Sequence, residues 1–368
     1  MSPTLFRYIT RRFLGTLAAA LMVVMLLIIL IDLVELMRRG SDTDASFGDL
    51  LVLALLHALS VANTTFPFVF MLAAMACFGR LARTSELVVT RAAGVSVWKL
   101  LLPVVLTSAC LGVLAFSVYN PISAATLSRF ETLEARYFRG QESLLSVSRE
   151  GLWLRQGGRD DQTVIRARRS NAQGTELEQV SLFRFGPQNT LLSRIEAARA
   201  DLGDHVWSLT DVHRWTFDPE NPDASPVRDE AEEAQVPTDL TSNHILESFA
   251  SPDAIGFWDL PDFIEALRAS GFSTLRHEMH FQTELAKPLL YSAMVLIGAA
   301  FSMRHVRFGG IGLMLVGATL TGFALFFVSD ITQALGASGA IPTLIAAWVP
   351  PAAAMLLALG LLFYLEDG

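Results

Sequence analysis

The chain has few charged residues and few cysteines for its length. Only 17% of its 368 residues are Asp, Glu, Lys or Arg, whereas 52% are hydrophobic. Soluble globular proteins carry about 25% charged residues, so this shortage excludes an ordinary soluble enzyme, a disordered chain and a nucleic-acid-binding protein. The two cysteines, Cys77 and Cys110, both lie in apolar stretches. Such a pattern excludes a small scaffold held together by disulfides.

Lysine is scarce as well. The sequence contains two, Lys99 and Lys287, and neither follows the glycine pattern of a phosphate-binding loop. We therefore expect that the chain does not hydrolyse ATP itself. The histidines of the segment 277–280 stand three residues apart, but the sequence suggests no third ligand for them, so we predict no metal site.

Uncharged runs predict membrane spans. A helix needs about 20 apolar residues to cross roughly 30 Å of hydrocarbon. The run before residue 304 reaches that length if Glu284 and Lys287 lie at its interfacial end. The uncharged runs are 14–31, 51–79, 100–128, 288–303, 308–329 and 331–365. We predict six transmembrane helices, three before a polar insert and three after it.

Basic residues predict the orientation of the spans, because Lys and Arg concentrate in cytoplasmic connections. Nine of them lie before the first span, between the second and third spans, and between the fourth and fifth spans. The other two short connections hold only Arg38 and Arg39. Both termini are therefore expected in the cytoplasm. For a bacterial chain, the inner membrane would hold the spans and the insert would lie in the periplasm.

The insert reads as a β domain. Residues 121–281 hold 26 acidic and 16 basic residues. Short segments with alternating apolar residues are separated by turn signals, which is typical of a β-sandwich or jelly roll. The segment 259–271 has one apolar helical face, and we predict a short amphipathic helix there, at the outer membrane surface.

These features together predict the fold class. We expect a membrane α-helical bundle of six transmembrane helices with an inserted all-β jelly-roll domain. The expected boundaries are 1–120 for the first three spans, 121–281 for the β domain and 282–368 for the last three spans.

The connection between the second and third spans, residues 79–100, is too long for a tight turn. Ser85 can cap a short helix near 84–94, and Glu86 lies in its first turn, where the helix dipole favours an acid. Gly94 is placed to end that helix. One interpretation is a helix at the membrane interface that only joins two spans. The other is a coupling helix that docks in a groove of a cytoplasmic motor, through an apolar anchor and a charged residue.

The segment SELVVTRAAGVS, residues 85–96, closely resembles the cytoplasmic coupling segment of the LptF/LptG family, the lipopolysaccharide-export permeases. Further segments resemble other parts of the family: TFPFVFMLAAMACFGRLARTSELVV its second span, and GLWLR and VWSLTDV strands of its periplasmic domain. The resemblance covers nearly the whole chain. It is closer to LptG than to LptF, and an LptF-type paralogue is the alternative.

The resemblance implies a permease subunit of an ABC transporter that extracts lipopolysaccharide from the inner membrane. One LptF-type and one LptG-type subunit would pair above a dimeric LptB-type ATPase. That ATPase would bind ATP and Mg²⁺, so the chain itself would be no enzyme and would bind no cofactor. LptC-type and LptA-type proteins would form the periplasmic bridge that carries the lipid toward the outer membrane.

The resemblance also implies the residues that contact the ATPase. Glu86 matches the acidic residue of the family's coupling helix, which pairs with a basic group on the ATPase. The rest of the predicted contact is Ser85, Leu87, Val88, Arg91 and Gly94.

Arg38 and Arg39 follow the first span on the outer side. By the resemblance they match basic residues that contact lipid phosphates, and arginine makes forked hydrogen bonds to phosphate. The alternative is a pair of arginines that snorkel to the membrane interface. Where the family has a lysine deeper in the membrane, this chain has Ile31 beside Asp32, so headgroup contacts would be fewer or rearranged.

Large apolar residues of the insert either form the core of a sandwich or line a groove for acyl chains. The candidates for the groove are Leu152, Trp153, Phe183, Phe185 and Trp207. Acids near the span ends leave a proton-coupled secondary transporter open as an alternative function. That alternative predicts inverted repeats and charges at mid-membrane, and the sequence shows neither.

Overall fold

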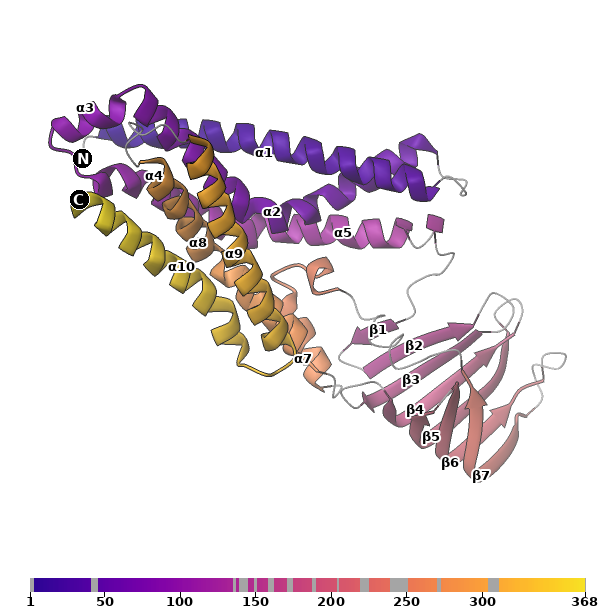
Figure 1. Ribbon diagram of the computed structural model, residues 1–368. Coiled ribbons are helices and arrows are strands. Elements are labelled where there is room, and N and C mark those ends of the chain that lie inside the picture. The colour runs from indigo at the N-terminus through magenta and orange to yellow at the C-terminus, as the bar shows by residue number, and fades with distance from the viewer. Residues whose placement is uncertain are drawn as a thin grey trace. The chain divides into compact units, whose positions relative to one another are not determined.

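The chain forms a helical unit and a sheet unit in the computed structural model (Figure 1). The helical unit comprises Met1–Arg139, Pro252–Trp258 and Leu275–Gly368, and the sheet unit comprises Gly140–Ser251 and Asp259–Thr274. These bounds differ from the expected ones because the third long helix continues past residue 121. The structure describes residues 3–40, 46–134, 137–138, 145–148, 151–157, 162–170, 175–186, 190–203, 205–218, 225–238, 251–269, 273–303 and 311–367.

Six helical segments in the described part of the chain are long and apolar enough to cross a membrane. They are α1 (Pro3–Arg39), α2 (Phe47–Arg83), α4 (Val97–Leu114) continued by a π-helical turn (Ala115–Tyr119) and α5 (Asn120–Glu134), α8 (Leu275–Ser302), α9 (Ile311–Ala337) and α10 (Thr343–Asp367). The prediction of six spans with an insert after the third is confirmed. The start of α1, the end of α10 and the short helix α3 (Glu86–Ala92) lie at the same end of the unit (Figure 1).

Helix α8 is the centre of the helical unit. It packs against α2, α4, α9 and α10. A Cβ atom on Gly112 of α4 would come within 2.4 Å of the Cα of Pro288, and one on Gly298 would come within 2.5 Å of the carbonyl oxygen of Met71. Small residues let membrane helices approach closely, so these two glycines set how near α4 and α2 lie to α8.

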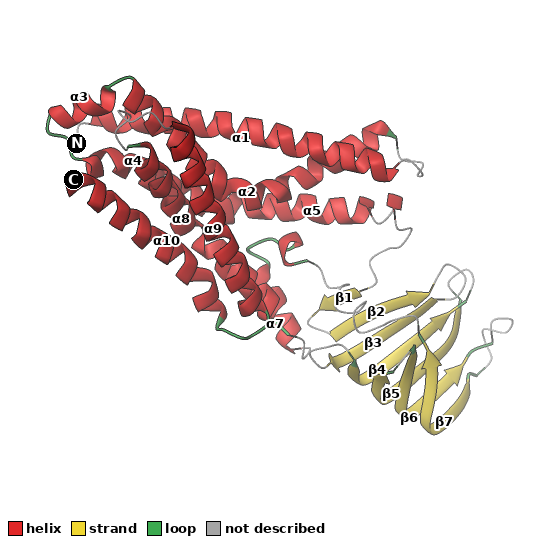
Figure 2. Ribbon diagram, in the orientation of Figure 1, coloured by secondary structure: helices red, strands yellow, loops and turns green. Residues whose placement is uncertain are grey.

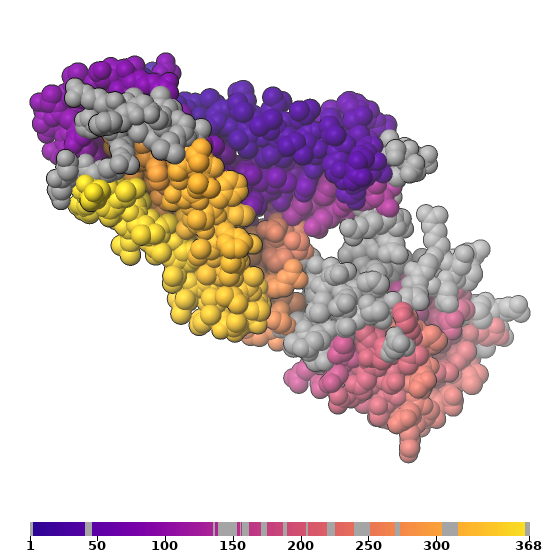
Figure 3. All heavy atoms as spheres, in the orientation of Figure 1, coloured from indigo at the N-terminus to yellow at the C-terminus, as the bar shows by residue number. Residues whose placement is uncertain are grey.

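Helices α1 and α9 leave apolar faces uncovered. Met22, Leu26 and Ile31 of α1 are each at least two-thirds exposed, and Leu320 and Phe327 of α9 are similarly exposed. The atoms of α1 (indigo) and α9 (orange) lie on the surface of the helical unit in Figure 3. Such faces suit contact with lipid tails or with another membrane helix.

A row of polar side chains lies along the buried side of α8. Lys287 Nζ donates to Asn63 Oδ1 of α2 at 2.7 Å and to Glu284 Oε1 at 2.5 Å. His280 lies between two carboxylates, with Nδ1 3.3 Å from Asp253 Oδ1 and Nε2 3.8 Å from Glu284 Oε1. The side chain of Glu284 is 2% exposed. Glu284 and Lys287 therefore form an ion pair that is buried between helices.

Removal of one partner of this ion pair should cost more than removal of both. Lys287→Met leaves Glu284 as an uncompensated buried charge, and we expect a loss of about 3 kcal/mol or more in the free energy of unfolding. Lys287→Met combined with Glu284→Gln leaves no bare charge and should recover most of that loss. Unfolding of the detergent-solubilised protein by SDS titration measures both. Equal losses in the single and double variants would contradict the prediction.

The sheet unit contains a seven-stranded antiparallel sheet whose strands follow chain order (Figure 2). The strands are β1 (Leu145–Ser148), β2 (Gly151–Gly157), β3 (Gln162–Ser170), β4 (Glu176–Phe185), β5 (Leu191–Leu202), β6 (Val206–Thr216) and β7 (Val227–Pro237). The predicted membrane helical bundle with an inserted β domain is confirmed. The described strands form one meander, because each pairs antiparallel with the next one along the chain, rather than in the Greek-key order typical of a jelly roll.

The alternation of buried and exposed side chains shifts by one residue in the middle of the sheet. The pairing skips Gln179 in β4 and Asp211 in β6, and both have positive φ, 52° and 58°. Around them the buried positions are three residues apart instead of two, from Leu177 to Val180 in β4. The register is the same on both sides of each skipped position, so no strand gains a residue relative to its neighbour. The apolar side chains before and after the shift belong to one core cluster, so the sheet presents a single apolar face.

Helix α7 (Leu260–Ala269) supplies part of that core. Leu267 is 1% exposed and belongs to the same apolar cluster as Trp207 and Leu209 of β6, with Phe263 packed against it. The predicted amphipathic helix is therefore present, and its apolar face packs against the sheet. The sheet covers that face, because a curved sheet of this size leaves one side of its core open to a helix.

Candidate functional site

Helix α3 forms the middle of the connection between α2 and α4. It ends in a Schellman motif: Gly94 N–H donates to the carbonyl of Arg91 at 2.9 Å and Val95 N–H to that of Thr90 at 3.2 Å. Gly94 has φ +81°, which glycine adopts without strain. Gly94 thus ends the helix as predicted.

The predicted cap at the start of α3 is wrong. Ser85 has φ 59°, in the left-handed region, and its side chain makes no capping hydrogen bond. The left-handed backbone of Ser85 turns its side chain away from the first helical N–H groups. Thr84 is the neighbour that bonds to the first helical residue, because its Oγ1 donates to Glu86 Oε1 at 2.8 Å.

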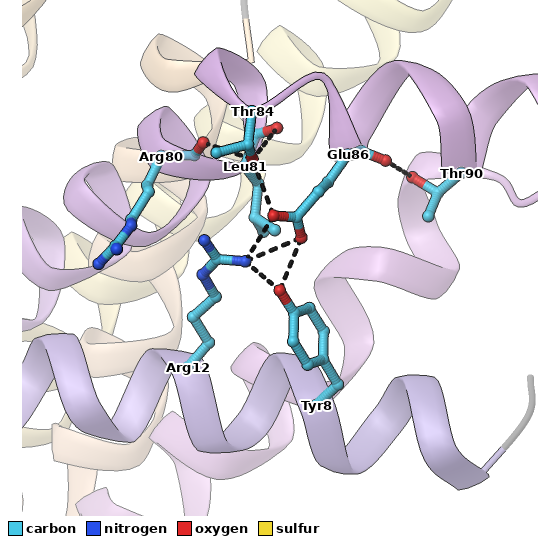
Figure 4. A network of polar contacts seen from close by, with 7 residues as sticks. All are labelled: Tyr8, Arg12, Arg80, Leu81, Thr84, Glu86 and Thr90. Atoms are coloured by element: carbon cyan, nitrogen blue, oxygen red, sulfur yellow. Dashed lines mark hydrogen bonds and ion pairs between the residues drawn. The ribbon is translucent and has the colours of Figure 1, made fainter.

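Glu86 is the centre of a polar network with α1 (Figure 4). Arg12 Nη1 donates to both carboxylate oxygens of Glu86, at 2.9 Å and 2.8 Å, and Tyr8 OH donates to Oε2 at 2.7 Å. Arg12 also contacts the Tyr8 hydroxyl. Sequence reasoning identified Glu86 and missed its partners, although Tyr8 and Arg12 are spaced four residues apart on one face of a helix.

These donors stabilise the charged form of Glu86. Hydrogen bonds from Tyr8 and Arg12 lower the pKa of Glu86 from 4.5 to about 2. A carboxylate with a lowered pKa stabilises the folded state above its ordinary pKa and loses that contribution as the pH falls toward the lowered value. The network therefore contributes its full stabilisation of the fold above about pH 4.5 and loses it as the pH falls toward about 2. Glu86 remains 35% exposed.

The remaining α3 residues divide between an inner and an outer face. Leu87 is 7% exposed and lines a small apolar hollow with Ile9, Phe78 and Leu100, so it holds α3 against α1, α2 and α4. Val88 and its neighbour Val89 are 62% and 66% exposed, and Arg91 is exposed. Of the predicted contact residues, Leu87 lies inside the chain, whereas Val88 and Arg91 lie outside. Val89 was missed.

Arg38 and Arg39 lie at the end of α1 and both carry an acidic partner. Arg38 Nη2 is 2.7 Å from Glu35 Oε1, and the Arg38 side chain is 74% exposed. Arg39 Nη2 is 2.8 Å from Glu134 Oε1 of α5, and Arg39 is 39% exposed. The carboxylates of Glu35 and Glu134 therefore partly neutralise the two guanidinium groups, which remain accessible to solvent.

Asp32 has a basic partner from the next span. His57 Nδ1 of α2 lies 2.8 Å from Asp32 Oδ2, and the His57 ring stacks on Phe130 of α5 at 4.5 Å between centroids. Beside this pair, Ile31 is 67% exposed. Where the resemblance leads one to expect a lysine, the surface of α1 is therefore apolar.

The candidate groove residues of the β domain do not share one surface. Trp207 is fully buried in the sheet core. Trp153 and Phe183 are half-buried and lie beneath the guanidinium groups of Arg166 and Arg194, at 5.3 Å and 5.8 Å from the ring centroids. Phe185 is half-buried on the same strand as Phe183. The side chain of Leu152 lies outside the described part of the structure.

No group of three metal-ligating side chains occurs among the described residues. His280 lies between Asp253 and Glu284, but Lys287 donates a hydrogen bond to the Glu284 carboxylate. The arrangement is therefore a charge network rather than a metal centre.

Known proteins resemble the chain over nearly its full length. Residues 7–364 match the family described as "Lipopolysaccharide export system permease LptF/LptG". The chain belongs to the LptF/LptG family of lipopolysaccharide export permeases. The family predicted from the coupling segment is thus confirmed.

Two curated relatives in the family are named lipopolysaccharide export system permease protein LptG. The one from Haemophilus influenzae is 25% identical over 365 residues, and the match covers 95% of each chain. The one from Escherichia coli is 25% identical over 358 residues, covering 97% of each chain. Both bear the LptG name, in agreement with the closer resemblance to LptG found in the sequence.

Gly94→Ala should loosen the end of α3, because an L-residue in the left-handed region costs about 1–2 kcal/mol. We expect faster amide hydrogen exchange in residues 86–95 of the variant. Gly79→Ala in α2 is the matched control, since a Cβ there meets nothing within 4 Å and alanine favours a helix over glycine. Exchange in residues 86–95 that is unchanged by Gly94→Ala would show that the Schellman motif does not hold this segment.

Proposed function

We propose that the chain is a permease subunit of an ABC transporter that extracts lipopolysaccharide from the inner membrane. The transporter passes the lipid to a periplasmic bridge of LptC-type and LptA-type proteins toward the outer membrane. Family membership over residues 7–364 supports this proposal. The observation that carries the mechanism concerns α3, the short helix between two spans. Leu87 and Glu86 hold this helix against the spans, whereas Val88 and Val89 form an exposed apolar face.

A dimeric LptB-type ATPase docks on this face from the cytoplasm. Val88 and Val89 provide the apolar anchor and Arg91 provides a charge that orients the contact, which is the composition that a helix-in-groove interaction needs. The ATPase binds ATP and Mg²⁺, and the chain itself contributes no catalytic group and binds no cofactor. Both termini share the cytoplasmic side with α3, and the sheet unit lies in the periplasm.

An LptF-type paralogue covers part of the exposed apolar surface of α1 and α9. Neither helix is buried within its own chain, and both show large apolar side chains such as Leu26 and Phe327. Without a hydrophobic force between helices in lipid, membrane helices associate through close packing of such faces. Lipopolysaccharide enters between the two subunits.

Arg38 and Arg39 contact the lipid phosphates. An exposed ion pair contributes little to stability. Arg38 is 74% exposed and Glu35 is 47% exposed, so this pair opens at little cost. A phosphate then replaces the carboxylate and accepts forked hydrogen bonds from the guanidinium group. Arg39, which is held by Glu134, orients the end of α1 and contributes its charge.

Val89→Glu should release the ATPase, because a charge would be buried in an apolar contact. We expect the amount of ATPase that co-purifies with the permease to fall severalfold, while the permease itself folds normally. Val227→Glu is the matched control, since Val227 is 71% exposed on β7 of the sheet unit. Normal co-purification with Val89→Glu would argue that α3 is a passive link between two spans.

Arg38→Glu combined with Arg39→Glu should weaken photocrosslinking of lipopolysaccharide to α1 and reduce export, because two phosphate-binding charges are reversed. Assembly with the ATPase should persist. Glu35→Gln is the comparison variant: it frees Arg38 from its own partner and should leave crosslinking normal or stronger. If the double variant crosslinks and exports as the unmodified protein does, the arginines merely snorkel to the interface.

A further inference from the structure

A proline interrupts the helical hydrogen bonds of the third span. Pro121 has no N–H to donate to the carbonyl of Ser117, four residues earlier, and its ring crowds that carbonyl. The π-helical turn Ala115–Tyr119 lies directly before it, and Asn120 N–H bonds to the carbonyl of Ala115 instead. The regular ladder of α4 therefore does not continue into α5, and other contacts must fix the direction of α5.

A short segment that follows the strands of the insert supplies the missing donor. We call this segment, Pro252–Trp258, the strap; it belongs to the helical unit. Trp258 Nε1 donates to the carbonyl of Ser117 at 2.9 Å. Phe257 N–H donates to Asn120 Oδ1 at 2.8 Å. An unpaired carbonyl within a membrane span is costly, so the indole of Trp258 replaces the N–H that the proline lacks.

Apolar contacts seat the strap on both sides of the break. The ring of Phe257 is buried and stacks on Phe281 of α8, with 5.0 Å between centroids. It also lies 4.9 Å from Phe116 of the π-helical turn. Ala254 packs against the apolar cluster that contains Phe130 of α5. The strap therefore contacts the turn before the break and the helix after it.

We infer that Trp258 and Asn120 are positioning residues, which hold α5 in a fixed direction relative to α4. The direction of α5 matters because Arg39 Nη2 of α1 donates to Glu134 Oε1 of α5 at 2.8 Å. An α5 that pivots about the break withdraws Glu134, and the end of α1 loses its orientation. The inference rests on the proposed contact of Arg39 with the lipid.

The direction of α5 can be measured in the full permease by double electron–electron resonance between two spin labels. Cys110 is exposed on α4, on one side of the break. Thr132→Cys provides an exposed site on α5, on the other side. Cys77 is buried and does not compete for the label.

Two variants remove the polar bonds of the strap. Trp258→Phe keeps an aromatic ring and removes the Nε1 donor, and Asn120→Ala removes the acceptor of the Phe257 N–H. In both we expect the distance distribution between the labels to broaden and its mean to shift. Trp348→Phe is the matched control, because it removes an indole bond to Gln282 that joins α10 to α8. It should leave the distribution unchanged.

A second-site change tests the cause that we assign. Pro121→Ala restores an N–H that can bond to the carbonyl of Ser117, so the donor from Trp258 is no longer needed. Trp258→Phe combined with Pro121→Ala should therefore give a distribution as narrow as that of the unmodified protein. A double variant as broad as Trp258→Phe alone would overturn the inference. An unchanged distribution in Trp258→Phe would overturn it as well.

The functional measurement uses the permease–ATPase complex in vesicles that contain lipopolysaccharide. Trp258→Phe and Asn120→Ala should lower photocrosslinking of the lipid to α1 severalfold and leave the amount of bound ATPase unchanged. Normal crosslinking in both, together with weakened crosslinking in the Arg38→Glu and Arg39→Glu double variant, would overturn the positioning role. Failure of the lipid contact itself is recognised separately, by normal crosslinking in that arginine variant.

Discussion

Several charged groups inside the helical unit are held by partners from the same chain, and the packing of the spans depends on this pairing. A bare charge within a membrane bundle is costly. Lys287 therefore bonds to Glu284 and to Asn63 of α2, and Asp32 of α1 pairs with His57 of α2. The bond from Lys287 to Asn63 joins α8 to α2, and the bond between His57 and Asp32 joins α2 to α1. The bond between Lys287 and Glu284 lies within α8 and neutralises both charges on its buried side. With the charges paired inside, α1 and α9 are left to present apolar surface.

The ion pairs fall into two classes by the free energy needed to break them: buried pairs that stabilise the packing of the helices, and exposed pairs that can exchange partners. Breaking a buried pair costs about 3–5 kcal/mol, which suits Glu284 and Lys287 as permanent links around α8. An exposed pair contributes little to stability, and Arg38 with Glu35 belongs to this class. The end of α1 that carries Arg38 can therefore exchange its carboxylate for another anion without disturbing the bundle.

Helix α3, which has seven residues, has one side that is fixed within the chain and one side that is exposed. Its inner side is fixed by Leu87 and by the Glu86 network, whereas Val88 and Val89 remain exposed. A helix that was mobile on its inner side could not transmit movement, and one that was covered on its outer side could not receive a partner. The division between the two faces thus gives α3 the properties that a coupling element needs.

The long apolar runs were sufficient to predict six spans, their order and the polar insert, because the need to cross the hydrocarbon leaves a strong signal in composition. The resemblance of the coupling segment predicted the family. Local signals were less reliable where several residues compete for one role. Ser85 looked like a helix cap, but its left-handed backbone carries its side chain away from the helix, and the bond to the first helical residue comes from Thr84.

By itself, the sequence determined which segments are apolar, that Gly94 ends α3, and which acid stands in the first turn of that helix. Only the tertiary structure decided what each of these groups faces. The apolar face of α7 turned out to be covered by the sheet, and Glu86 by Arg12 and Tyr8, which lie more than 70 residues away along the chain. The physical reason is that the periodicity of a sequence reveals that one face of a helix or strand is apolar. The residue types reveal which groups are charged. The partner, however, is chosen by packing between segments that are distant in sequence.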